Sequence, residues 1–229
     1  MLFNMKEKNN KYDSKRDFSL IELLVIIAVI AILLSLLLPS LKKARHKALS
    51  AVCQSNLSNI GKGVMMFSKN NSGFMPTNNI GNSSGFTPGL VYYTSKYLGV
   101  EVDTNNPLNT DLSDTVFHEP VLNGFISHPV AAGYGWNWRY MGYKQSKHAQ
   151  VYWPRRLESI YEPSHKMLAA DTSDTKYLGG NVYFRYQNVG NRHNNRINAL
   201  HGDGHTESVN SAPLRTNNND KWWYGDSAH

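Results

Sequence analysis

The feature that most constrains this chain is a continuous apolar stretch near its N-terminus, residues 18–38, which reads FSLIELLVIIAVIAILLSLLL. Glu22 is the only residue of this stretch that can ionise, and Ser19 and Ser35 are its other polar residues. An apolar helix of about 20 residues matches a hydrocarbon core of about 30 Å. Because apolar side chains occupy every face of such a helix, it is buried in lipid or among other helices. We therefore predict a transmembrane helix over residues 18–38.

The segments on both sides of this stretch are polar and basic. Residues 1–17 form a hydrophilic leader that we expect to be cytoplasmic. The stretch is followed by four closely spaced basic residues, Lys42, Lys43, Arg45 and Lys47. Since basic residues flank both ends, charge alone does not decide the orientation. A secretory signal peptide has an apolar region of about 7–15 residues and a small-residue cleavage site. Here the apolar stretch is longer and Pro39-Ser40 follows it, so we expect the helix to stay in the mature protein.

Residues 39–73 are expected to continue the helix as an amphipathic segment. Its apolar residues recur at helical spacing along one stripe: Leu49, Cys53, Leu57, Ile60, Val64 and Phe67. We expect Pro39 to kink the helix and the segment Asn70–Gly73 to end it. The whole helix would then run for roughly 50 residues, or about 75 Å. Because Cys53 lies on the apolar stripe, we predict a packed small side chain rather than a reactive thiol.

Residues 74–229 predict a β-rich globular head, so the expected fold class is α+β. Their apolar runs are short, and asparagine, glycine, tyrosine and tryptophan are frequent. Strands are predicted at Val91–Tyr93 with Tyr97–Leu98, at Lys166–Ala170, at Val182–Tyr186 and at Ile197–Leu200. Asp203-Gly204 suits a turn that requires positive φ, so we predict a hairpin between Ile197–Leu200 and Thr206–Val209. Residues 101–115 are expected to form a polar loop and residues 210–220 a flexible tail.

The composition gives little sign of catalysis or of nucleic-acid binding. The net charge is +7, but the basic residues are spread along the chain apart from the cluster after the apolar stretch. A single cysteine excludes an internal disulfide, and the chain has no His-Glu-x-x-His motif. Several side chains near the C-terminus can ligate metals: Asp171, Asp174, His193, His201, Asp203 and His205. Their spacing defines no site, so we expect a capped hairpin with Asp203 in the turn and His193 bonded to backbone. We predict that the protein is not an enzyme.

The stretch that begins Phe18-Ser19-Leu20-Ile21-Glu22 resembles the N-terminal signature of type IV pilins and type II secretion pseudopilins. An aromatic first residue, an acid at the fifth position and a long apolar helix carry the resemblance, and Pro39 stands where many of these proteins have proline. The resemblance implies that a prepilin peptidase cuts between Asp17 and Phe18 and methylates the new amino group of Phe18. It also implies that Glu22 acts in assembly. Asp17 departs from the family, which usually has glycine before the cut.

A second resemblance lies near the C-terminus. His193, nine further residues and Asp203-Gly204 resemble the H-x9-DG motif of a large group of bacterial pilin-like proteins. The segment Tyr134–Asn137 and the strand ending at Asp171 are also similar to elements of that group. Together the two resemblances imply a pilin-like fold, a long helix packed on a small β-rich head. Calcium is a possible cofactor because major pseudopilins bind it, but no calcium ligands can be carried over to this chain.

These observations predict a structural subunit held in the inner membrane by one span, with a cytoplasmic N-terminus and a periplasmic or extracellular head. Its expected partners are the prepilin peptidase, membrane lipid and other pilin or pseudopilin subunits in a pilus or pseudopilus. One alternative is a permanently anchored binding module whose aromatic clusters, Tyr134–Tyr143 and Trp222–Tyr224, bind a glycan or a protein. Another is a metal-dependent enzyme that uses His193 and Asp203.

Overall fold

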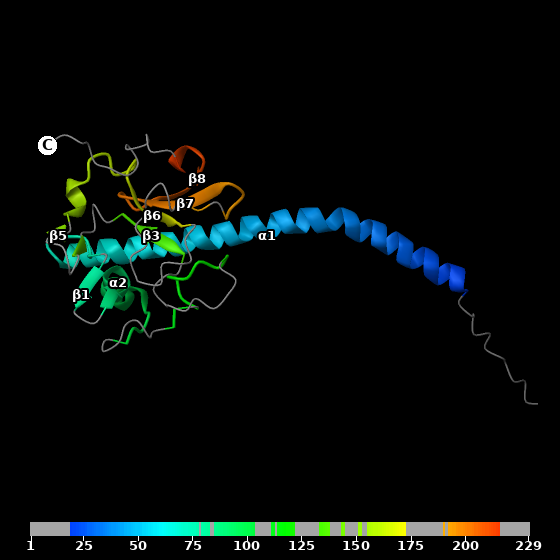
Figure 1. The fold of residues 1–229 in the computed structure, drawn as a ribbon, viewed down its shortest axis with the longest axis horizontal. Coiled ribbons are helices and arrows are strands. Elements are labelled where there is room, and N and C mark those ends of the chain that lie inside the picture. The colour runs from blue at the N-terminus through cyan, green and yellow to red at the C-terminus, as the bar shows by residue number, and fades with distance from the viewer. Residues whose placement is uncertain are drawn as a thin grey trace, which may run out of the picture. The chain divides into compact units, whose positions relative to one another are not determined.

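The computed structural model consists of two compact units, Met1–Ala44 and Arg45–His229, and we call the second the folded unit (Figure 1). It describes residues 19–77, 79–82, 85–103, 111–112, 114–121, 133–137, 143–144, 151–152, 155–172, 190 and 192–215. The predicted leader, Asp17, Phe18, the strand at Val182–Tyr186 and the cluster Trp222–Tyr224 lie outside these residues.

Helix α1 (Leu20–Asn70) is continuous over 51 residues and passes through Pro39. Its length and its end confirm the prediction of one long helix that stops before Gly73, while the kink at Pro39 stays a prediction. The C-terminal end is closed by local hydrogen bonds. The Gly73 N–H donates to the Ser68 carbonyl (2.9 Å), and Ser68 Oγ donates to the Gly73 carbonyl (2.7 Å). Gly73 has φ +84°, a left-handed conformation that glycine adopts at little cost.

Helix α2 (Gly89–Leu98) occupies the segment for which the sequence predicted short strands, so that prediction was wrong. Valine and tyrosine favour strands, but the buried residues Leu90, Val91 and Thr94 recur at helical spacing and pack toward α1. Thr94 is fully buried, and its hydroxyl donates to the Leu90 carbonyl one turn earlier (2.7 Å). Glycine on α1 allows this close packing: a Cβ on Gly63 would lie 3.1 Å from Leu98 Cδ1, a tight contact. Tertiary packing therefore overrides the local preference.

The central sheet has four antiparallel strands in the order β3 (Tyr134–Trp136), β6 (Met167–Asp171), β7 (Arg196–His201) and β8 (Thr206–Asn210). This confirms the strand predictions around β6 and β7. The predicted hairpin is also confirmed, because Ile197 pairs with Val209 and Leu200 with Thr206. Two smaller antiparallel pairs are β1 (Asn79–Asn82) with β2 (Gly85–Pro88), and β4 (Tyr143–Lys144) with β5 (Val151–Tyr152). Short 3-10 helices are η2 (Leu157–Ser159) and η4 (Pro213–Arg215).

The core of the folded unit lies between the sheet and the C-terminal part of α1 (Figure 1). The predicted apolar stripe supplies its helical side, and Cys53, Leu57 and Ile60 are fully buried there. Tyr134 and Trp136 of β3 are buried in the same core, so this part of the aromatic cluster serves packing. All five residues of β6 are buried. Because side chains alternate along a strand, the sheet is covered on both faces.

Candidate functional site

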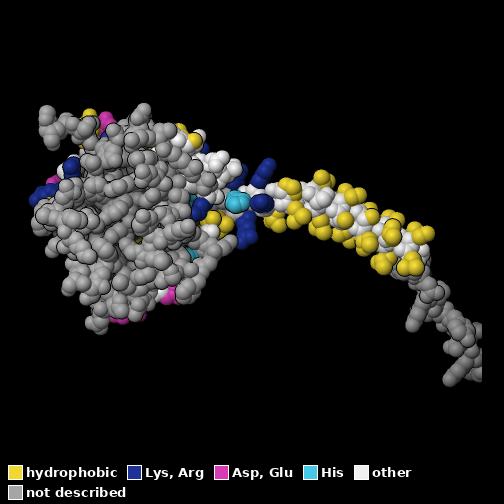
Figure 2. All heavy atoms as spheres, viewed as in Figure 1, with side chains coloured by type: hydrophobic (Ala, Val, Ile, Leu, Met, Phe, Trp, Pro, Cys, Tyr) yellow, Lys and Arg dark blue, Asp and Glu magenta, His cyan; other side chains and the backbone are white. Residues whose placement is uncertain are grey.

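The first functional feature is the exposed helix segment, by which we mean residues 20–41 of α1. Every one of these residues is exposed; Leu36, for example, has 72% of its surface accessible to solvent. Figure 2 shows hydrophobic side chains covering this part of the helix. The helix is long and apolar enough to cross a membrane. Exposing such a surface to water is unfavourable.

Glu22 lies at the start of this segment and takes part in a helix cap. Ser19 Oγ accepts the Ile21 N–H (3.2 Å), and Glu22 Oε2 accepts the Ser19 N–H (3.3 Å). This reciprocal arrangement is a capping box, which satisfies backbone donors that have no partner inside the helix. The resemblance to pilins assigned Glu22 to assembly, and the cap was not predicted, although Ser-x-x-Glu is its signature. The pairing of Glu22 with the Phe18 amino group stays a prediction, since Phe18 lies outside the described residues.

The second feature is the segment from His193 to Gly204, whose two ends have different surroundings. Asp203 lies in the β7–β8 turn, as predicted, and accepts the His205 N–H (3.1 Å). Its Oδ1 also lies 2.6 Å from His205 Nδ1. Gly204 has φ +89°, and a Cβ there would lie 2.1 Å from Met65 Cε. The positive φ of the turn therefore favours glycine at this position, and a larger residue would also displace the end of the Met65 side chain.

His193 is buried among carboxylates, so the prediction that it bonds to backbone was wrong. Its Nε2 lies 3.2 Å from Asp171 Oδ2 and 3.6 Å from Glu119 Oε1. Arg192 reaches the other oxygen of Glu119. Cys53 on α1 completes a buried cluster in which one donor atom from each of Cys53, Glu119, Asp171 and His193 lies within 4.8 Å of the others. We call these four residues, together with Arg192, the buried cluster.

Burial dominates the electrostatics of the buried cluster. It raises the pKa of the Asp171 carboxyl, while His193 and the Asn198 N–H, which donates to Asp171 Oδ2 (2.7 Å), act in the opposite direction. Burial raises the pKa of the Cys53 thiol to about 12 and lowers that of Arg192 to about 10. Cys53 is fully buried on the apolar stripe of α1, which confirms the prediction of a packed small side chain.

Sequence reasoning found some members of the buried cluster and missed others. His193 was singled out by the H-x9-DG resemblance and Asp171 by the end of its strand. Glu119 and Arg192 carried no signal, because an acid in a loop and a base before a strand are ordinary surface residues in most sequences. His193 and Asp203, the pair proposed for a metal-dependent enzyme, belong to different groups of neighbours, because His193 lies against Asp171 and Asp203 lies against His205.

A third group lies on the β7–β8 hairpin. The rings of His201 and His205 are stacked with centroids 4.3 Å apart, and His201 Nε2 lies 3.1 Å from Glu207 Oε1. His201 is fully buried, whereas His205 is exposed. Burial lowers the pKa of His201 to about 4, and the neighbouring His205 and His165 act in the same direction. Glu207 and Asp203 oppose this shift without reversing it.

This shift predicts that acid destabilises the folded unit through His201. Because the pKa is about 6.5 in the unfolded chain and about 4 in the folded one, the unfolded chain binds more protons between these values. The stabilising contribution is complete above pH 6.5 and disappears as the pH falls toward 4, with a total loss of about 3 kcal/mol. Urea unfolding at a series of pH values should show this slope, and His201→Gln should flatten it.

The control for this measurement is His46→Gln, at an exposed position on α1. It should leave the pH slope unchanged because the His46 side chain is exposed and belongs to no buried group of the folded unit. A His201→Gln protein that keeps the full wild-type slope would contradict the assignment.

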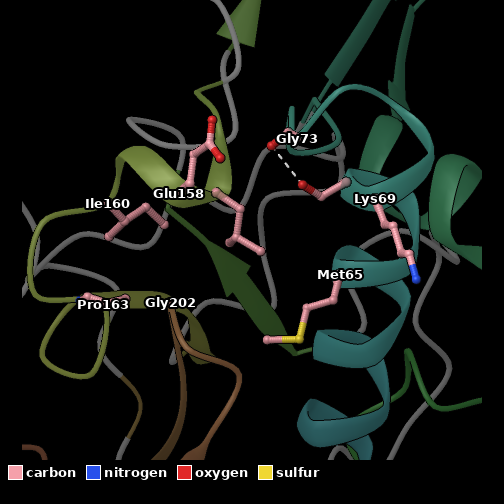
Figure 3. Close-up of a pocket in the computed structure, with 9 residues that line it drawn as sticks. Met65, Lys69, Gly73, Glu158, Ile160, Pro163 and Gly202 are labelled. Atoms are coloured by element: carbon pink, nitrogen blue, oxygen red, sulfur yellow. Dashed lines mark hydrogen bonds between the residues drawn. The ribbon is translucent and has the colours of Figure 1, made fainter.

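A groove of about 390 Å³ lies where the end of α1 faces η2 and the turn after β7. Figure 3 shows Met65, Ile160 and Pro163 along it, with Lys69 and Glu158 at its margin. The Ser68 hydroxyl that lines it donates to the Gly73 carbonyl rather than into the groove. The groove thus offers apolar contact but no arranged polar group that would select a ligand.

Comparisons of the chain with known protein families, with curated proteins and with solved structures found no match. The likeness to pilins and pseudopilins therefore rests on the residues of the apolar stretch and of the motif from His193 to Gly204.

Proposed function

We propose that this protein is a pilin-like structural subunit, held in the inner membrane by the exposed helix segment and then assembled helix to helix into a filament. The observation that carries the proposal is the complete exposure of residues 20–41 on a helix that continues into a separately folded unit. A soluble protein would bury such a surface. A filament subunit does not bury this surface in its own fold, because lipid covers the segment before assembly and identical segments of other subunits cover it afterwards.

The acid at the start of this segment gives the proposal its mechanism. A carboxylate at the centre of a membrane helix costs roughly 2.5–3.5 kcal/mol, and less near the end. Glu22 lies in the first turn, where the cap with Ser19 and the helix dipole both favour its negative charge. Cleavage between Asp17 and Phe18 would place a positive amino group one turn away. That amine, on the same or a neighbouring subunit, neutralises Glu22 and sets the register of the packed helices.

Glu22→Gln tests the role of this charge while preserving the cap, because the amide oxygen can still accept the Ser19 N–H. Losing one partner of a buried charge pair costs about 2–5 kcal/mol per contact. Filaments should therefore fall by more than about tenfold in a strain whose only such subunit is the variant. The amount of membrane-inserted protein should not change. Electron microscopy of sheared filaments and immunoblots of membranes measure the two quantities.

The matched control is Glu158→Gln on the surface of the folded unit, where Glu158 makes an exposed ion pair with Arg156 (3.1 Å). Exposed ion pairs contribute little to the free energy of folding, so filaments should form as in the wild type. Intact mass of the extracted protein adds an independent reading: a start at methylated Phe18 supports a processed subunit, whereas a start at Met1 supports a permanent anchor. Undiminished filaments with Glu22→Gln would refute the assembly role of the carboxylate.

A further inference from the structure

Four side chains of the buried cluster could serve as metal ligands, and they come from distant parts of the folded unit. Cys53 lies on α1, Glu119 in the segment 114–121, Asp171 at the end of β6, and His193 just before β7. Cys53, Glu119 and Asp171 have no exposed surface, and His193 is 5% exposed. All four donor atoms lie within 4.8 Å of one another. A thiol, an imidazole and two carboxylates at this separation are a complete ligand set for one metal ion.

Polar atoms inside this cluster lack the partners that buried groups normally have. Glu119 Oε1 and His193 Nε2 are buried, and neither forms a hydrogen bond with any residue that the structure describes. Two carboxylates also converge on the same nitrogen, His193 Nε2, at 3.2 and 3.6 Å. Buried polar atoms without partners destabilise the folded chain. Converging acids add repulsion, which a cation between them would remove.

We propose that Cys53, Glu119, Asp171 and His193 bind one Zn²⁺ ion. Tetrahedral zinc, with bonds of about 2.0 Å to nitrogen or oxygen and 2.3 Å to sulfur, places its donors about 3.3–3.8 Å apart. The two separations measured from His193 Nε2 already have this size. Thiolate and imidazole favour zinc, whereas calcium takes oxygen ligands, so this donor set differs from the calcium site that the pseudopilin resemblance suggested.

The charges around the four donors fit a divalent ion. On binding, the Cys53 thiol loses its proton to solvent, so a thiolate and two carboxylates carry three negative charges. Zn²⁺ and the Arg192 guanidinium, which contacts Glu119, balance them. The Asn198 N–H, which donates to Asp171 Oδ2 (2.7 Å), holds that carboxylate in place. Such outer contacts orient ligands and typically change metal affinity by about 10–100-fold when removed.

The chemistry assigned to this ion is structural. Four protein ligands leave no open position for water or substrate, which distinguishes structural zinc sites from catalytic ones. The ion links α1 to the end of β6, to the residues just before β7 and to the segment 114–121. The only cysteine is unpaired, so no disulfide links these segments. The inference concerns the folded unit and stands independently of the proposed assembly.

The test uses the full chain purified in detergent, first stripped with chelator and then equilibrated with Zn²⁺ alone. Elemental analysis after gel filtration should give one ion per chain. Co²⁺ in place of Zn²⁺ should give the near-ultraviolet charge-transfer band of a sulfur-bound cobalt ion. His193→Gln and Cys53→Ser should weaken Zn²⁺ binding by about 100-fold or more, beyond the effect of outer-shell changes. The matched control, His46→Gln at an exposed position of α1, should keep wild-type affinity.

Two results would overturn the proposal. One is a wild-type protein with native circular dichroism that retains no stoichiometric ion, which would mean that Arg192 with Glu119 and His193 with Asp171 form ion pairs without a metal. The other is a wild-type cobalt complex without the sulfur band, which would remove Cys53 from the ligand set. Because both readings use the unaltered chain, they decide the matter even if a variant fails to fold.

Discussion

Replacing Asp171 with asparagine is expected to lower the free energy of unfolding of the folded unit by about 3–5 kcal/mol. The Asp171 carboxylate is fully buried and lies 3.2 Å from His193 Nε2. It also accepts the Asn198 N–H at 2.7 Å. The asparagine amide is neutral, so the negative charge beside His193 is lost. The amide presents either an N–H donor or a weaker oxygen acceptor to His193 and to the Asn198 N–H. Removing one side of a buried charged network leaves the other side without compensation, and this loss exceeds that of the missing bond.

Urea unfolding of the full chain in detergent with excess chelator measures this effect without any contribution from a bound metal. The matched control is Asp203→Asn, the same substitution at the exposed turn of β7–β8, where the loss should stay within about 1 kcal/mol. The double variant Asp171→Asn with His193→Gln should lose less than the sum of the two single losses, because the two side chains act on each other. Equal small losses at Asp171 and Asp203 would contradict the structural role of the buried cluster.

The long helix and the hairpin were predictable because their signals are local. The apolar run is long enough to cross a bilayer, and a stripe of apolar residues at helical spacing follows it. Together they predicted one continuous helix over residues 20–70, and Asn70–Gly73 predicted its end. Asp203-Gly204 fixed the turn and, with it, the register of Ile197 against Val209. In both cases the residues that decide the structure are neighbours in the chain.

Helix α2 was not predictable by the same means, because its tyrosines and valines favour strands and its helical spacing is short. It forms because Leu90 and Thr94 pack on α1, where Gly63 allows close approach. The buried cluster was hidden for a related reason. Glu119 and Arg192 look like solvated charges, and their burial follows from the arrangement of β6, β7 and α1 around them. Charged residues whose partners are distant in the chain produce no periodic pattern in the sequence, so their burial cannot be predicted from it.

Leu57→Ala is expected to lower the free energy of unfolding of the folded unit by about 2–5 kcal/mol. Leu57 is fully buried in the core between α1 and the sheet. Removing its side chain loses the free energy of burying the missing methyl and methylene groups, and it leaves a cavity that close-packed neighbours fill only in part. Alanine is the best helix former, so α1 itself is not weakened. Urea unfolding followed by tryptophan fluorescence measures the loss, with Trp136 in the same core as reporter.

The matched control is the same substitution at Leu36, which is 72% exposed on the same helix. Comparing the two variants distinguishes the role of the exposed helix segment from that of the buried part of α1. Leu36→Ala should leave the free energy of unfolding of the folded unit unchanged, because that side chain makes no part of its core. If identical helices pack in the filament as proposed, Leu36→Ala should reduce filament yield, whereas Leu57→Ala should act on filaments only through stability. A Leu36→Ala protein that unfolds as easily as Leu57→Ala would show that the exposed segment belongs to the folded core. A Leu36→Ala protein with wild-type stability and full filament yield would place the helix contacts on another face of α1.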